Sequence, residues 1–102
     1  MIYKISDEEY FELARRVCGQ LSSPCYFSGV VEIEGTSAEV VLRLTASLII
    51  YRRKAEPFRT YDEGDTIEHI SAVWWDFLCE DEEGILEDNF DFEKFTEAML
   101  AV

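Results

Sequence analysis

The sequence is poor in the residues that build metal centres and nucleophilic sites. Its 102 residues include one histidine, three cysteines and no C-x-x-C pair. His69 and Cys79 stand ten residues apart on one predicted strand. A strand rises about 3.3 Å per residue, so roughly 33 Å separate them. A zinc site cannot contain both residues, so at most three of the four histidine and cysteine side chains remain as ligands. We therefore expect no metal site and no cofactor, and the same spacing excludes a catalytic pair of His69 with Cys79.

Signatures of nucleotide binding and catalysis are missing as well. The chain contains no P-loop, no G-x-G-x-x-G and no G-x-S-x-G. The acidic stretches before Gly64 and Gly84 fail the EF-hand pattern, because Arg59 and Cys79 would stand at the first ligand position. A weak, non-specific cation site among the acids stays open. We expect a protein that is not an enzyme, with an enzyme of unrecognised site as one alternative.

No apolar segment is long enough to cross a membrane. The longest uncharged apolar run, residues 44–51, is far shorter than the roughly 20 residues that a transmembrane helix needs. The first ten residues, MIYKISDEEY, lack the apolar segment of a secretory signal. An odd number of cysteines fits reduced thiols. We expect a cytoplasmic protein without membrane contact.

Basic residues are scarce in the second part of the chain. The net charge is −13, from 22 acidic and nine basic residues. Acids and bases balance over residues 1–61, so residues 62–102 carry the whole charge, with Lys94 as their one base. A field of this sign repels phosphates and anionic lipids, so direct binding to nucleic acid is not expected. It favours solubility or a basic partner. An acidic inhibitor that imitates DNA is the second alternative.

Two segments carry the signals of amphipathic helices. Residues 7–18 follow a capping box made by Ser6 and Glu9, and Gly19 suits the C-terminal end. Residues 92–100 follow Asp91, a good N-cap residue. The apolar stripe of the second helix consists of Phe92, Phe95, Met99 and Val102, and Phe90 and Phe95 have the spacing of a hydrophobic staple.

Apolar and polar residues alternate between the two helices, which predicts strands. We place them at residues 26–34, 38–50 and 67–79, with a short fourth strand at 85–87. In the first hairpin, Gly35 suits a two-residue type II′ turn. That turn pairs Ile33 with Ala38 and Val31 with Val40.

The stretch VWW at residues 73–75 raises the question of which tryptophan is buried. Val73, Trp75, Phe77 and Cys79 share the odd face of their strand, which we assign to the core. Trp74 then shares the outer face with Ile70 and Asp76. Counting across the second hairpin places Asp76 opposite Arg43, with Trp74 within diagonal reach of that arginine for a cation–π contact.

These elements predict a single α+β domain over residues 1–102. An N-terminal helix, an antiparallel meander of three to four strands and a C-terminal helix follow one another. Because the sheet has one apolar face, we expect both helices to pack on that face.

One local basic cluster interrupts the acidic chain at the end of the second strand, and aromatic residues lie next to it. The candidate partner-binding residues are Tyr51, Arg52, Arg53, Lys54, Arg59 and Trp74. Such a cluster suits an acidic peptide or phosphates, but charges also keep a strand end soluble, and acids from the same loop can pair with them.

The segments FSGVVEIEG, LIIYRR, VWWDF and FDFEKF resemble those of small, acidic, uncharacterised bacterial α+β proteins, some of them linked to mobile elements. This resemblance implies no activity and assigns no functional residue. We expect a non-enzymatic interaction domain that binds a protein partner, or a second copy of itself, through an exposed sheet face or the basic loop. An uncovered face with Ile49, Tyr51, Ile70 and Trp74 would support this function.

Overall fold

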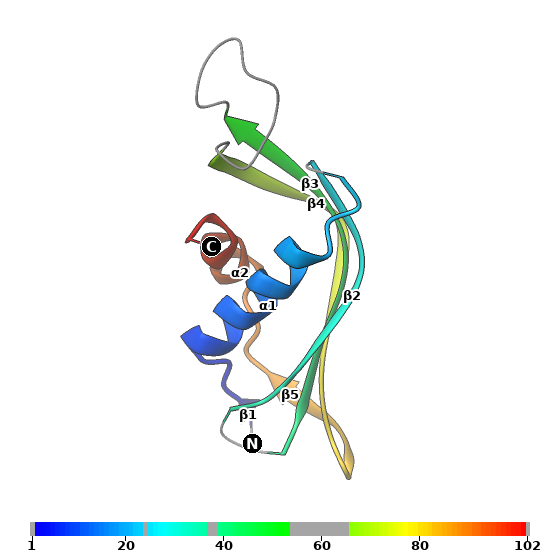
Figure 1. Ribbon diagram of the computed structural model, residues 1–102. Helices are drawn as coiled ribbons and strands as arrows, with labels where there is room; N and C mark the ends of the chain where they lie inside the picture. The colour runs from blue at the N-terminus through cyan, green and yellow to red at the C-terminus, as the bar shows by residue number, and fades with distance from the viewer. Residues whose placement is uncertain (1, 24, 37–38, 54–65, 102) are drawn as a thin grey trace.

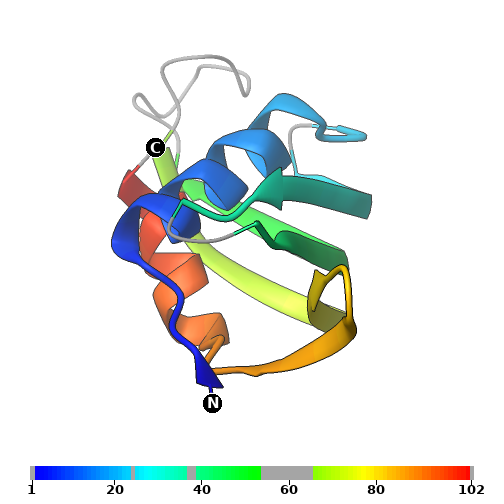
Figure 2. The same cartoon turned by 90° about the horizontal axis from the view of Figure 1, so that it is seen from below.

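The computed structural model describes residues 2–23, 25–36, 39–53 and 66–101 (Figure 1). Two helices lie on the concave side of a curved sheet, which confirms the α+β class (Figures 1 and 2). In chain order the elements are β1 (Ile2–Tyr3), α1 (Asp7–Gly19), β2 (Tyr26–Glu34), β3 (Val41–Arg53), β4 (Thr66–Asp81), β5 (Gly84–Asp88) and α2 (Phe92–Ala101).

The sheet has five strands in the order β1-β5-β4-β3-β2. Strands β2 to β5 form the predicted antiparallel meander. The pairing of β1 with β5 is parallel, so the sheet is mixed rather than purely antiparallel. Sequence analysis missed β1 because two residues, Ile2 and Tyr3, are too few to show alternation.

The core lies between the helices and the concave face of the sheet. Strand β3 contributes most to it, because Leu42, Leu44 and Leu48 are completely buried. From the helices, Leu13 of α1 and Phe95 of α2 are buried to the same extent. Regular alternation in β3 and helical spacing in α1 therefore direct the apolar side chains into one layer.

The predicted N-terminal caps of both helices are present in the structure, whereas α1 includes Gly19 and has Gln20 as its C-cap residue. The hydroxyl of Ser6 accepts a hydrogen bond from the Glu9 amide (3.2 Å), and the Glu9 carboxylate accepts one from the Ser6 amide (2.8 Å). At the start of α2, the Asp91 carboxylate accepts from the Glu93 amide (2.9 Å). Phe90 and Phe95 lie with ring centroids 6.3 Å apart, which confirms the staple. Val102 of the predicted stripe lies outside the described residues.

The first hairpin differs from the prediction in its register. Ile33 pairs with Leu42 and Val31 with Leu44, four residues further along β3 than a two-residue turn would place them. The Gly35 amide donates to the Val40 carbonyl (2.9 Å), so the connection is longer. A shift of four residues keeps every side chain on its own face, which is why the apolar pattern could not detect it.

An irregularity in β4 changes the predicted faces. Ser47 pairs with Trp74 and Leu48 with Ala72, so Val73 is an extra residue in a β-bulge. The bulge reverses the alternation on its N-terminal side. Ile70 is therefore buried in the core, with 6% of its surface exposed, instead of lying on the outer face. Val73 is 63% exposed and is not a core residue.

The predicted neighbours of Arg43 are also wrong. Arg43 lies opposite Leu78, whereas Asp76 lies opposite Thr45, an offset of two residues. The guanidinium of Arg43 instead pairs with the Glu32 carboxylate at 3.4 Å. Trp74 lies opposite Ser47, four residues along β3 from Arg43, so about 13 Å separates the two positions and a cation–π contact is out of reach.

Candidate functional site

The convex face of the sheet, called here the outer face, carries no helix of the described chain (Figure 1). A set of large apolar side chains is exposed on it, and we call this set the outer-face patch. Its members are Tyr26 (37% exposed), Val30 (47%), Ile49 (36%), Tyr51 (49%) and Trp74 (51%). Single apolar side chains are often exposed, but their alignment on one face of a sheet marks a candidate interface.

Strand register brings the outer-face patch together from three strands. Tyr26 of β2 lies directly opposite Ile49 of β3. Two residues further along β3, Tyr51 stacks on His69 of β4, with ring centroids 5.6 Å apart. Trp74 lies opposite Ser47, next to the row of Tyr26 and Ile49. Residues distant in sequence therefore form one aromatic surface.

The same face becomes polar toward the turns at its other end. The hydroxyls of Ser28 and Ser47 are hydrogen-bonded at 3.1 Å, next to Trp74. Further along lie the ion pair of Glu32 and Arg43 and then the exposed Glu34. A partner on this face would meet apolar rings at one end and carboxylates at the other.

Of the predicted basic cluster, the structure describes the side chain of Arg52. Arg52 pairs with Ile67, which packs against the core, so Arg52 lies on the helical side of the sheet. Burial raises the pKa of the Cys18 thiol at the end of α1, and the positive charge of Arg52 opposes this effect. Arg53 belongs to β3, but its side chain is not described. Lys54 and Arg59 lie outside the described residues.

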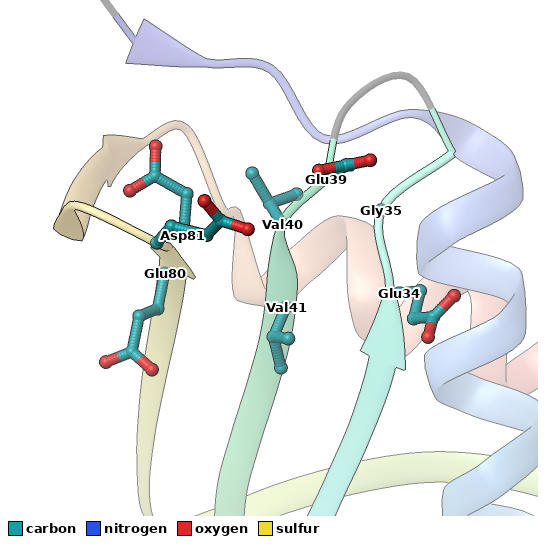
Figure 3. Close-up of a pocket in the computed structure, with 8 residues that line it drawn as sticks. Glu34, Gly35, Glu39, Val40, Val41, Glu80 and Asp81 are labelled. Atoms are coloured by element: carbon teal, nitrogen blue, oxygen red, sulfur yellow. The ribbon is translucent and has the colours of Figure 1, made fainter.

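The turns at the end of the sheet away from Tyr51 border an acidic hollow that the sequence did not reveal. It is open and measures about 610 Å³. Its lining consists of Glu34, Gly35, Glu39, Val40, Val41, Glu80, Asp81 and Glu82. Figure 3 shows Val40 and Val41 between the acidic residues of the neighbouring strands. Within the described chain, none of these carboxylates forms an ion pair.

The second tryptophan of the VWW stretch belongs to an aromatic cluster on the helical side. Trp75 stacks on Phe92 at 5.2 Å, with an angle of 11° between the rings, and Phe77 stacks on Phe90 at 4.1 Å. Trp75 faces the helices as predicted, but 41% of its surface is exposed. It closes the rim of the core rather than filling its centre.

The described histidine, cysteine and acidic side chains form no metal-binding cluster, and the thiol of Cys79 is not activated. Over the described ranges, no three residues of the histidine, cysteine, aspartate and glutamate types are grouped so that they could hold a metal ion. Burial raises the pKa of the Cys79 thiol, and the carboxylates of Asp88, Glu9 and Asp81 raise it further. A raised pKa lowers the thiolate fraction, and the thiolate is the nucleophile.

In the part of the chain that the structure describes, no helix has the length and apolar character needed to cross a membrane. No protein-family model matches the chain, and no curated protein or solved structure is similar to it. The resemblance to small acidic bacterial proteins stays a prediction. The function is therefore inferred from the site alone.

Proposed function

We propose that this chain is a non-enzymatic interaction domain that docks a protein partner on its outer-face patch. The observation that carries the proposal is the alignment of five large apolar side chains on a sheet face without a helix. Tyrosine and tryptophan dominate the binding energy of many interfaces, because they bury much apolar area and keep a polar group for hydrogen bonds.

The charge of the chain narrows the chemistry of the partner. With a net charge of −13, and with Glu34 and the acidic hollow at one end of the outer face, the chain attracts a positively charged surface. A second copy would bring the same negative charge. We therefore propose a different protein, with an apolar patch flanked by lysine or arginine. The three free thiols agree with the predicted cytoplasmic location.

The test is to compare the binding of the native chain with that of an outer-face variant. Ile49→Thr/Tyr51→Thr removes two members of the patch from the central strand and keeps residue types that favour strands. Capture of a partner from the native host should fall about thirtyfold, because a central aromatic residue contributes about 2 kcal/mol. The partner should also cross-link to the outer face of the native chain.

Phe11→Ala is the matched control, because Phe11 is 42% exposed on α1, on the opposite side of the sheet. This variant should capture the partner as the native chain does. If the control loses the partner as strongly as the outer-face variant, or if the cross-links map to the helices, docking on the outer face is wrong.

A second candidate function is inhibition of a DNA-binding protein by the acidic end. The observation that favours it is the hollow, whose lining carboxylates form no ion pair within the described part of the chain. Glu34→Gln/Glu80→Gln should then weaken binding to a basic DNA-binding protein, and the affinity should fall steeply with salt. Glu8→Gln, an exposed acid of α1, is the control. Equal effects of both changes would leave only non-specific attraction.

A further inference from the structure

We infer that the partner adds an extended strand to the open edge of β4, and that this strand is basic with interspersed apolar side chains. The inference rests on the proposed function and specifies how the partner is held. It makes the backbone of β4, as well as the outer-face patch, part of the interface.

The edge is open because β5 pairs with only the last part of β4. Strand β3 pairs with β4 along its whole length, from Thr66 to Glu80. Strand β5 pairs with Cys79, Glu80 and Asp81 only. In Figure 2, β5 (orange) leaves β4 (yellow) after the turn. Among the described residues, no strand pairs with the other side of β4 before Cys79, and such an edge presents free amide and carbonyl groups.

The side chains along this edge are large, apolar and solvent-exposed. Val73, Trp74 and Trp75 are exposed by 63%, 51% and 41%. The six residues from Ile70 to Trp75 include no charge and no proline, the two usual protections of an exposed edge. Val73 is the extra residue of the bulge, and bulges increase the local twist of a strand.

The other edge of the sheet, formed by β2, is better protected. Glu32 and Glu34 of this strand, with Glu12 and Arg16 of α1, line a second hollow beside it. An incoming strand would have to pass these four charged side chains. An added strand would therefore meet fewer charged side chains at the open edge of β4 than at the edge of β2.

The acidic residues near the open edge of β4 indicate what kind of strand would bind there. Trp75 stacks on Phe92, the sequence neighbours of Phe92 are the exposed Asp91 and Glu93, and Asp76 follows Trp75 on β4 itself. Over the described ranges, no cation pairs with these three carboxylates. A second copy would place the same acids opposite them, whereas lysine or arginine side chains of another protein would neutralise them.

The experiment uses two synthetic nine-residue peptides of equal charge. One alternates lysine and valine, and the other carries proline in place of two central valines. The first peptide should slow the hydrogen exchange of alternate β4 amides between Ile70 and Leu78 by about tenfold, because strand addition is read by the backbone. The proline peptide should bind about tenfold more weakly, since proline donates no hydrogen bond.

Variants of the protein test the position of the edge. Val73→Lys should weaken binding of the lysine–valine peptide about tenfold. Ile85→Lys adds the same charge to a residue of β5 that is 71% exposed, and it should have a smaller effect. Equal binding of the two peptides, equal effects of the two variants, or a stable dimer of the chain alone with protected β4 amides would each overturn the inference.

The two proposals fail in different ways. If Ile49→Thr/Tyr51→Thr abolishes capture of the native partner while the β4 amides never become protected, docking on the outer face stands and strand addition falls. If the β4 amides are protected and the change in the outer-face patch has no effect, the proposed function falls instead.

Discussion

At the scale of single residues, Glu9 connects three parts of the fold. It is 1% exposed, and its carboxylate accepts hydrogen bonds from the Tyr3 hydroxyl, the Ser6 amide and the Thr36 amide. These partners belong to β1, to the start of α1 and to the connection after β2. Burial alone would raise the pKa of Glu9, but the three donors outweigh it, so the pKa lies below its usual value of 4.5.

We expect Glu9→Gln to destabilise the protein by about 1–3 kcal/mol at neutral pH. An NH2 group replaces one carboxylate oxygen, and this group cannot accept the hydrogen bond of a buried donor. Urea unfolding of the variant at neutral pH measures this loss. Glu8→Gln changes the same charge at an exposed position of the same helical turn. Equal losses in the two variants would contradict the role of Glu9.

The pH dependence follows from the direction of the Glu9 pKa. Since the pKa is lower in the folded state, the charged carboxylate stabilises the fold fully above the unfolded value near 4.5. This contribution is lost as the pH falls through the lower folded value. The difference between the native chain and Glu9→Gln should therefore narrow below pH 4.5, which unfolding at a series of acidic pH values checks. A difference that stays constant would contradict the assignment.

At the scale of the element, the positions of β4 that face the helices change from even-numbered to odd-numbered residues at the bulge. Ile70 and Ala72 face the helices before the bulge, and Phe77 and Cys79 face them after it. Val73 absorbs the change of phase, so both sets of apolar side chains reach the same core. This arrangement leaves Val73 and Trp74 exposed at the edge, where the inferred strand would bind.

Deletion of Val73 should preserve the fold, because Ala72 and Trp74 already pair with the consecutive residues Leu48 and Ser47. The free energy of unfolding should stay within about 1 kcal/mol of the native value. Deletion of Ser47 removes a residue that pairs with both β2 and β4, and it should cost about 3 kcal/mol or more. Chemical denaturation of both variants checks the contrast. Similar losses would show that the bulge is required.

At the scale of the whole molecule, uncompensated negative charge is the dominant property. The ion pairs of Glu12 with Arg15 and Arg16, and of Glu32 with Arg43, are all exposed. Exposed pairs contribute little to stability. With a net charge of −13, the acidic residues outnumber the basic ones and repel one another, so the compact state carries an electrostatic cost that a basic partner would relieve.

Salt should therefore stabilise the isolated chain. Between about 0.01 M and 0.5 M sodium chloride the screening length falls severalfold. We expect a gain on the order of 1 kcal/mol, which raises the melting temperature by roughly 4–8 °C for a domain of this size. Thermal unfolding monitored by circular dichroism measures it, with a neutral osmolyte at equal osmolality as the control. A melting temperature that falls with salt would contradict the prediction.

The candidate site was predictable only in part. Tyr51 and Trp74 were recognised from their place beside polar residues on alternating strands, and the structure places both on the outer face. Tyr26 and Val30 were missed, although Val30 breaks the polar face of its strand and could have given the signal. The acidic hollow was also missed, because it joins turns whose distance in sequence hides their proximity.

The sequence by itself determined the helices, the strands from β2 to β5 and the side of the sheet that faces the core in β2 and β3, because these depend on local caps and on a period of two residues. Only the tertiary structure decided which residues face each other. The hairpin register shifted by an even number of residues, and the bulge at Val73 moved Ile70 inward and left Trp75 at the rim. The physical reason is that a strand's pattern records its faces, whereas register is settled by packing and pairing across the whole sheet.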